Sequence, residues 1–422
     1  MATPEIRKGG EGAPSRGRKA AVGFILVSVW LDVLSLGVII PAYPKLVQQF
    51  AGGDASRAGL YIGWFGSLWC AAQFFGGPIQ GALSDRFGRR PVLLISLFGL
   101  ALDYLVMAFA PNLGWLLVGR VLSGVTAASM PVASAYIADT TAPDKRAATF
   151  GMIGAAWGVG FIAGPSIGGL LGDIAPRLPF LAAAALTLLG ALYGLVVLPE
   201  SLKPENRSPF RWAKAHPAAS LSFLASQREL LTLSVVNVLA VFSHNALPTV
   251  FVLYASNRYG WDMKVTGAAL ALTGVCNIVV QGVLVKHVVA RIGEWGAVLL
   301  GLVGGGLGFA IYGFAPSGWL FVTGTPVFAL MGLFNPGFQG LITRRVSPSE
   351  QGRLQGANSA LTGLVGIVAP TILGSTYAWF VAPGHPYVPG SAFFLGVAAY
   401  ALGSLIALSA LVRAPREARA AA

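Results

Sequence analysis

The chain has 422 residues, of which 55% are hydrophobic and only 11% are charged. A soluble globule needs more ionised groups on its surface, and several apolar runs are long enough to cross a bilayer. These proportions exclude a soluble domain and predict a helical membrane protein with many spans. The formal net charge of +13 does not predict a nucleic-acid partner, because the basic residues gather in alternate loops, as membrane topology requires.

In chain order, the apolar segments predict twelve spans in two groups of six. They lie at about 21–43, 59–83, 91–110, 113–138, 147–171 and 178–198, then 229–255, 264–286, 296–315, 318–342, 354–379 and 392–412. Four prolines and mixed charges between the groups are typical of a linker. The expected parts are therefore a basic tail (1–19), an N-terminal six-helix bundle (20–198), a linker (199–228), a C-terminal six-helix bundle (229–413) and a second tail (414–422).

The basic tail shows no cleavage site, so we expect the first apolar segment to remain as a span. An even number of spans then places both termini on the same side. The tails and even-numbered loops hold most Lys and Arg residues, which predicts that they face the cytoplasm of a cell membrane. Cys70 and Cys276 stand alone in apolar segments, which argues against a disulfide framework or a metal cluster.

The two halves of the chain repeat each other. Six residues recur at a constant offset, so that Ile137, Pro143, Gly151, Gly158, Pro165 and Gly169 return as Ile342, Pro348, Gly356, Gly363, Pro370 and Gly374. A second echo places Arg86 and Gly88 against Arg291 and Gly293. Repeated six-span bundles are typical of secondary transporters, whose solute site lies between the bundles near the membrane midplane.

The most distinctive stretch joins the second and third predicted spans. It reads G-x-L-x-D-R-x-G-R-R from Gly81 to Arg90. A positive-inside charge run explains its arginines but not Asp85 among them. The pattern resembles the loop between spans two and three of the major facilitator superfamily. That resemblance implies an all-α integral membrane fold with twelve helices in two pseudo-symmetric six-helix bundles.

Other stretches resemble the tetracycline-efflux branch of the drug:proton antiporters, among them GRVLSGVTAA (119–128) and GVGFIAGPSIGG (158–169). In the family, the loop acid and arginine latch the cytoplasmic ends of the bundles together, joined by an acid at the end of span four. The matching residues here are Gly81, Asp85, Arg86, Gly88, Arg89, Arg90 and Asp139. The span-five element associated with antiporters corresponds to Gly160, Gly164, Pro165, Gly168 and Gly169, although close helix packing would require the same small residues.

An antiporter needs a carboxyl group that both sides of the membrane can reach. Asp32 and Asp103 are the acids that lie well inside predicted spans. Asp32 should lie roughly 16 Å deep, near the midplane of a ~30 Å core, while Asp103 and Arg120 should lie roughly 12 and 10 Å below the outer face. We expect the three to line the cavity, with at least one acid exchanging a proton for solute. A structural Asp103–Arg120 salt bridge and a buried protonated Asp32 are the alternatives.

Other polar and aromatic residues within the predicted spans are candidates for solute contact. They are Gln73, Trp157, His244, Asn245, Asn277, Gln281, Asn335, Gln339 and Asn358. Amides in membrane helices also bridge neighbouring helices, a histidine is often a satisfied core residue, and Trp also marks bilayer interfaces. The sequence leaves both interpretations open.

The chain departs from the tetracycline pumps in its second half. Gly304 to Gly306 occupy the part of span nine where those pumps have an acid, and Asn277 replaces a histidine in span eight. We therefore predict a proton-coupled exporter of drugs or amphiphilic small molecules, with tetracycline as one candidate. The alternatives are an importer or facilitator of a small metabolite and a receptor without flux.

An enzyme is not expected, because the chain shows no nucleophile and base pair, metal-ligand spacing or phosphate loop. The predicted partners are a small-molecule substrate, protons and the lipid bilayer, with no nucleic acid. No cofactor is expected, because the proton gradient would supply the energy. The family resemblance implies a monomer.

Overall fold

The computed structural model describes residues 16–127, 129–141, 143–209, 224, 228–347 and 350–420. Most of the basic tail and the middle of the linker lie outside the described residues. Within the described part, nine helical segments are long and apolar enough to cross a membrane. Large apolar side chains such as Val196 and Trp319 are 87% and 85% exposed, which fits a surface that faces lipid rather than water.

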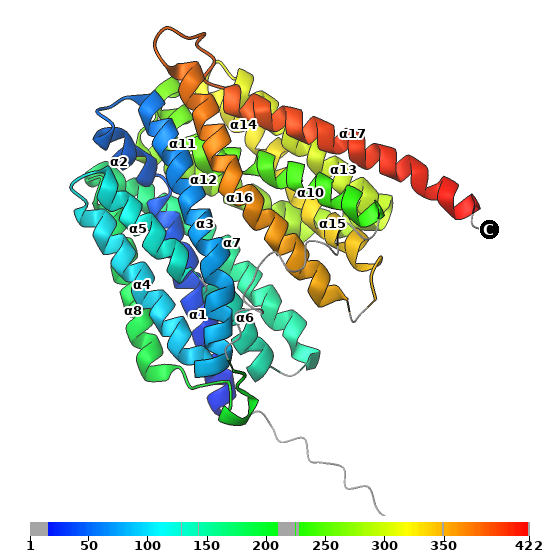
Figure 1. The fold of residues 1–422 in the computed structure, drawn as a ribbon. Coiled ribbons are helices and arrows are strands. Elements are labelled where there is room, and N and C mark those ends of the chain that lie inside the picture. The colour runs from blue at the N-terminus through cyan, green and yellow to red at the C-terminus, as the bar shows by residue number, and fades with distance from the viewer. Residues whose placement is uncertain are drawn as a thin grey trace, which may run out of the picture.

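The first half of the molecule forms one bundle (Figure 1). Its helices are α1 (Arg16–Ile39), α2 (Tyr43–Phe50), α3 (Ala55–Phe87), α4 (Arg89–Phe109), α5 (Leu113–Thr126), α6 (Ser129–Thr140), α7 (Pro143–Ile174) and α8 (Leu178–Val197). The short α2 follows the first span, and α5 with α6 makes the fourth. This half therefore contains six spans, as the apolar segments predict.

The second half forms the other bundle, after a short turn η1 (Pro204–Asn206). Its elements are α10 (Arg228–His244), α11 (Ala246–Tyr259), α12 (Met263–Val279), the π-helix η4 (Val280–Leu284), α13 (Val285–Phe314), α14 (Gly318–Ala329), η5 (Leu330–Leu333), α15 (Phe334–Thr343), α16 (Gln351–Val381) and α17 (Ser391–Ala420). Spans seven and ten are interrupted, and α13 joins the end of span eight to span nine. The twelve-helix fold is confirmed, while the exact domain boundaries stay a prediction.

Two glycines that the sequence repeat aligns adopt equivalent backbone conformations. Gly88 ends α3 with a φ of 108°, and Gly293 turns the backbone inside α13 with a φ of 72°. Side chains strongly disfavour such positive φ angles, so glycine is the residue that allows each sharp turn. The sequence echo therefore corresponds to a repeated turn between spans two and three and between spans eight and nine.

The two halves contact each other mainly along two helix pairs, α3 with α16 and α7 with α12, and to a smaller extent where α11 meets α2 and α3. In Figure 1, α3 runs beside α16 although the two lie far apart in the sequence. Close approach depends on small residues: a Cβ atom added to Gly63 would lie 2.6 Å from the carbonyl oxygen of Pro370. Next to it, the hydroxyls of Ser67 and Thr371 share a hydrogen bond of 2.7 Å.

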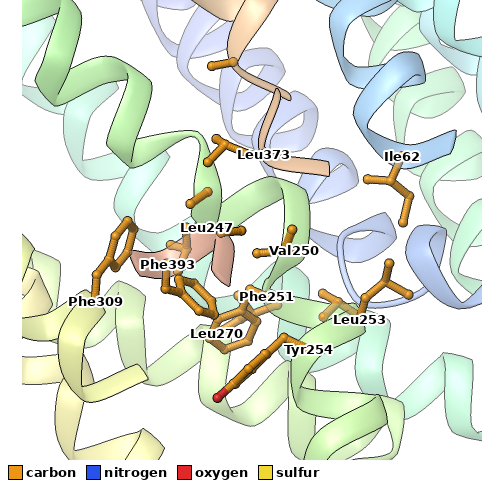
Figure 2. Close-up of a cluster of buried hydrophobic side chains, with 14 of the residues drawn as sticks. Ile62, Leu247, Val250, Phe251, Leu253, Tyr254, Leu270, Phe309, Leu373 and Phe393 are labelled. Atoms are coloured by element: carbon orange, nitrogen blue, oxygen red, sulfur yellow. The ribbon is translucent and has the colours of Figure 1, made fainter. Parts of the chain in front are cut away.

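The halves are joined at the end of the molecule that contains α2, which we call the closed side. Ile62 of the first half belongs to one buried cluster with Leu253 and Leu373 of the second half, and all three are labelled in Figure 2. Further out, the Lys45 ammonium donates to the Ser256 hydroxyl and to the Trp261 carbonyl oxygen. These contacts seal the closed side.

The opposite end contains the Gly88 turn, and we call it the open side. Several glycines on the helices of the interface would meet nothing within 4 Å if a Cβ were added, namely Gly77 and Gly81 of α3, Gly151 and Gly154 of α7, and Gly352 of α16. The same helices touch closely on the closed side. The halves therefore diverge toward the open side.

Candidate functional site

Three predicted residues meet in a cavity inside the first half, which we call the acid cavity. Asp32 from α1, Asp103 from α4 and Arg120 from α5 line this cavity of about 350 Å³. Gln73 and Trp157, also predicted from the sequence, line it from α3 and α7. The depth calculation from the sequence concerned Asp32, Asp103 and Arg120, and the structure brings these three together from three different helices.

Asp103 is completely buried. Among the described residues, no donor makes a hydrogen bond of standard geometry to either of its carboxyl oxygens. Gly119 of α5 allows this position, because a Cβ atom there would lie 2.5 Å from Asp103 Oδ1. The Ser123 hydroxyl of α5 is the donor that lies beside this carboxyl group. Because a buried carboxylate is costly to desolvate, the group still requires either a proton or a nearby cation.

Arg120 is the nearest candidate cation, but in this conformation its guanidinium is held elsewhere. It lies over the ring of Tyr43, 4.6 Å from the centroid, and Nη2 contacts Met107 Sδ at 3.4 Å. Among the described residues, no ion pair within 4.0 Å joins it to Asp103. The two side chains therefore share a cavity without forming the salt bridge that the sequence left open.

A larger cavity of about 810 Å³ lies between the two halves, and we call it the central cavity. Helices α3, α10, α15 and α16 contribute to its wall. Seven amide side chains line it: Gln73, Asn237, Asn245, Asn335, Gln339, Gln355 and Asn358. Sequence reasoning missed Asn237 and Gln355, although both lie in predicted spans and the same criterion of polar residues in apolar segments would have found them. Gln73 lines both cavities.

The remaining solute candidates lie outside the lining of both cavities. His244 stacks on the ring of Phe328, with centroids 5.9 Å apart. Gln281 Nε2 donates to Asn277 Oδ1 at 3.1 Å, where α12 passes into the π-helix. These two amides therefore satisfy each other within one span.

The span-five element packs on two neighbours. Gly160, Gly164 and Gly168 face α1, where a Cβ atom on Gly164 would lie 2.6 Å from Gly37 Cα. Gly169 instead faces the second half, since its Cβ would lie 2.5 Å from the carbonyl oxygen of Met263, and the carbonyl of Pro165 lies against Gly267 of α12. This element thus holds α1 against α7 and forms part of the interface between the halves.

The charged loop forms an ion-pair network on the open side. Arg89 Nη1 contacts Asp85 Oδ1 at 2.5 Å and Arg89 Nε contacts Asp139 Oδ2 at 3.2 Å. Arg86 lies over the ring of Phe87, and Arg90 Nη2 donates to the carbonyl oxygen of Leu195 at 2.7 Å. In this conformation these partners belong to the first half, and the linker adds Ser201, whose hydroxyl donates to Asp139 Oδ2 at 3.2 Å.

Glu200 completes this network, and sequence reasoning missed it. Its carboxylate accepts from the backbone N–H of Arg89 at 2.8 Å and of Arg90 at 3.2 Å. It thereby satisfies free N–H groups at the positive end of the α4 dipole. A Cβ atom on Gly88 would collide with this carboxylate. An isolated acid directly after the sixth predicted span was the only sequence signal.

The family comparison decides which group of proteins has this arrangement. A model described as Major Facilitator Superfamily matches residues 25–370. The chain belongs to the major facilitator superfamily. This confirms the resemblance found in the loop between spans two and three.

Relatives within the superfamily are similar over nearly the whole chain. Tetracycline resistance protein, class C, of Escherichia coli is 36% identical over 391 residues, covering 92% of this chain and 96% of that protein. Tetracycline resistance protein, class B, of Escherichia coli is 33% identical, covering 91% and 94%. Multidrug resistance protein 2 of Bacillus subtilis is 28% identical, covering 83% and 87%. The expected tetracycline-efflux-like branch is therefore confirmed.

Solved structures of other superfamily transporters share the fold. The human organic anion transporter MFSD10 (TETRAN) matches with a TM-score of 0.67 and 22% identity, covering 92% of this chain and 99% of that one. The nucleoside transporter NupG matches with a TM-score of 0.74 and 14% identity, covering 93% and 98%. At these identities the likeness concerns the fold alone. The chain is a multi-pass membrane transporter of this superfamily.

Proposed function

We propose that this protein is a secondary active transporter that exports a drug or another amphiphilic small molecule in exchange for protons. Its relatives include tetracycline and multidrug resistance proteins, which favours a drug-like solute. The observation that carries the proposal is the pairing of two cavities. Asp32 and Asp103 lie in the acid cavity, which shares Gln73 with the central cavity.

Asp103 is the proposed proton carrier, with Arg120 as its switchable partner. With a proton on the carboxyl group, Asp103 needs no cation and Arg120 rests on Tyr43, which is the arrangement described above. When the proton leaves, the carboxylate attracts the guanidinium, because an uncompensated buried charge is costly. Asp32 of α1, which lines the same cavity, is the second acid that can exchange a proton. Movement of Arg120 would thus link the proton to the helices that surround both cavities.

Alternating access would occur by rocking of the two halves. We place the open side in the cytoplasm, because the Gly88 loop and the other basic loops lie there, and both termini on the same side. The described conformation is then inward-facing. Asp85, Arg89 and Asp139 would control closure of this side, as the family resemblance implies. One chain contains both halves and both cavities, so we propose that the monomer is the working unit.

The test is flux in proteoliposomes with an imposed pH gradient, using a panel of dyes, antibiotics and sugars and a dye that reports internal pH. Export of a solute should consume the gradient. Asp32→Asn and Asp103→Asn should reduce this coupled flux toward the level of empty vesicles for at least one of the two. Asp173→Asn, which changes an exposed acid outside both cavities, is the matched control.

Two results would contradict the proposal. Full proton-coupled flux in both Asp32→Asn and Asp103→Asn would remove these acids from the mechanism. Solute uptake that continues equally well without a pH gradient would instead indicate a facilitator.

A further inference from the structure

The described lining of the central cavity offers groups for hydrogen bonding but no ionised group. Among the described residues that line it, the polar side chains are amides, hydroxyls and one thiol, and none carries an ionised group. The ionisable residues Asp32, Asp103 and Arg120 line the neighbouring acid cavity instead. Within the described residues, Gln73 alone contributes to both linings.

Some of the amide groups in the central cavity already have partners. Gln355 Nε2 donates to Gln339 Oε1 at 2.8 Å, and Asn245 Nδ2 donates to the carbonyl oxygen of Val241 at 2.8 Å. Asn358 differs, because its side chain is 6% exposed and neither its Nδ2 nor its Oδ1 has a hydrogen-bond partner among the described residues. A buried amide without partners costs stability unless a ligand or water satisfies it.

We propose that the central cavity binds an uncharged solute rich in hydroxyl, carbonyl or amide groups, without a bound divalent cation. This proposal rests on the proposed export function and specifies its cargo. A cation or a metal chelate would lose its hydration without gaining a carboxylate, which hard cations require. A neutral solute loses less hydration and can form hydrogen bonds with the amides that line the cavity. The volume lies within the range of roughly 300–1,000 Å³ typical of small-molecule sites.

The cargo and the proton would also bind in two different cavities. The solute would contact the amides while Asp103 handles the proton in the adjacent cavity. Gln73 is then a positioning residue, since it lies in both linings and would transmit the presence of cargo to the acid cavity. Replacement by Met would keep the length of its side chain but remove both polar groups.

Binding to purified protein in lipid nanodiscs, measured by calorimetry, tests the cargo class. Tetracycline provides a matched pair of probes, because it can be supplied with excess EDTA or with excess Mg²⁺. Chloramphenicol serves as a neutral probe and ethidium as a permanent cation. The metal-free and neutral probes should bind at least about tenfold more tightly than the metal-loaded and cationic probes.

Variants locate the binding in the cavity. Asn358→Leu should weaken binding of the neutral probe by about fivefold or more, because it removes an amide from the lining of the cavity. Gln339→Met is a second variant in case Asn358→Leu fails to fold. Asn206→Leu in the exposed turn η1 is the matched control. Gln73→Met should retain probe binding better than Asn358→Leu and yet lower the number of protons moved per solute.

Preferential binding of Mg²⁺-tetracycline or ethidium, or binding of no probe at millimolar concentration, would overturn the cargo assignment. Unchanged binding of chloramphenicol in both Asn358→Leu and Gln339→Met would do the same. These outcomes differ from failure of the export proposal, which would appear as absence of proton-coupled flux with every solute in proteoliposomes.

A second inference comes from the ion pairs on the open side. The repeat offset that relates Gly88 to Gly293 also relates Arg89 to Glu294, and the offset that relates Ile137 to Ile342 relates Asp139 to Arg344. Arg89 pairs with Asp139 at 3.2 Å, and Glu294 pairs with Arg344 at 2.7 Å. The same ion pair therefore occurs in each half with its charges exchanged.

We infer that this exchange of charges stabilises closure of the open side. Halves related by pseudo-symmetry approach through equivalent positions when they close around a central axis. Equal charges at those positions would repel, whereas exchanged charges place Asp139 toward Arg344 and Arg89 toward Glu294. The charged residues that pair within each half in the described conformation would thus pair between the halves when the open side closes.

The double substitution Glu294→Arg with Arg344→Glu tests this device, because it keeps the pair within the second half but gives both halves the same charge order. Spin labels at Lys145 and Gly352, with Cys70 and Cys276 replaced by alanine, report the distance across the open side. The population of molecules in which the open side has closed should fall by about two- to fivefold, the range for exposed ion pairs. Adding Asp139→Asn should recover part of it. An unchanged distance distribution with unchanged thermal stability would overturn the inference.

Discussion

The glycine contact between α3 and α16 gives the sharpest prediction about conformational balance. Gly63→Ala places a Cβ atom 2.6 Å from the carbonyl oxygen of Pro370 and 3.2 Å from Gly374 Cα. Both neighbours are backbone atoms, so the halves must move apart to accommodate the methyl group. Overpacking of this kind costs typically ~1–3 kcal/mol.

The overpacking destabilises only one conformational state of the transporter. The contact lies on the closed side and must open when the transporter faces outward, so the added methyl group destabilises the described conformation and leaves the outward-facing one unaffected. The gain in helix propensity from alanine applies to both states and cancels. A difference of ~1–3 kcal/mol corresponds to a shift of about 5- to 150-fold toward the outward-facing state.

The assay is a distance distribution across the closed side, with spin labels at the exposed residues Gln49 and Tyr387. The long-distance population should grow in Gly63→Ala. Gly306→Ala is the matched control, because its Cβ would lie 3.5 Å from Tyr400 Cβ, an ordinary contact within the second half. An unchanged distribution in Gly63→Ala, or an equal shift in Gly306→Ala, would refute the reasoning.

Three further predictions concern single contacts. Ser67→Ala should shift the same distance distribution in the same direction by about fivefold, because losing the hydrogen bond to Thr371 across the halves costs ~1 kcal/mol. No shift would mean that this bond also forms in the outward-facing state. Gly119→Ala should displace the Asp103 carboxyl group and reduce proton-coupled flux, while binding of a neutral probe in the central cavity stays normal. Unchanged coupling would show that the position of this carboxyl group is not critical. Glu200→Gln should lower the stability of the fold by ~0.5–2 kcal/mol, because a weaker acceptor then caps α4. An unchanged melting temperature would show that this cap contributes little to stability.

The order of residues along the chain was enough to predict the span pattern, the repeat and the family. These features follow from composition along the chain, because a bilayer imposes a length on each apolar segment and a charge bias on each loop. It also placed Asp103 and Arg120 at similar depth, since helical rise converts residue number into depth. The cavity that they share with Asp32 was therefore predictable in outline.

The neighbour that each polar residue faces depends instead on how the helices pack in three dimensions. Asn277 and Asn335 look alike in the sequence, yet one bonds within its own span and the other lines the central cavity. Helix rotation sets this difference, and close packing of small residues against partners far away in the chain sets the rotation. Arg120 resting on Tyr43, and Glu200 capping α4, are further contacts of this kind, because no local pattern encodes a neighbour that only folding brings near.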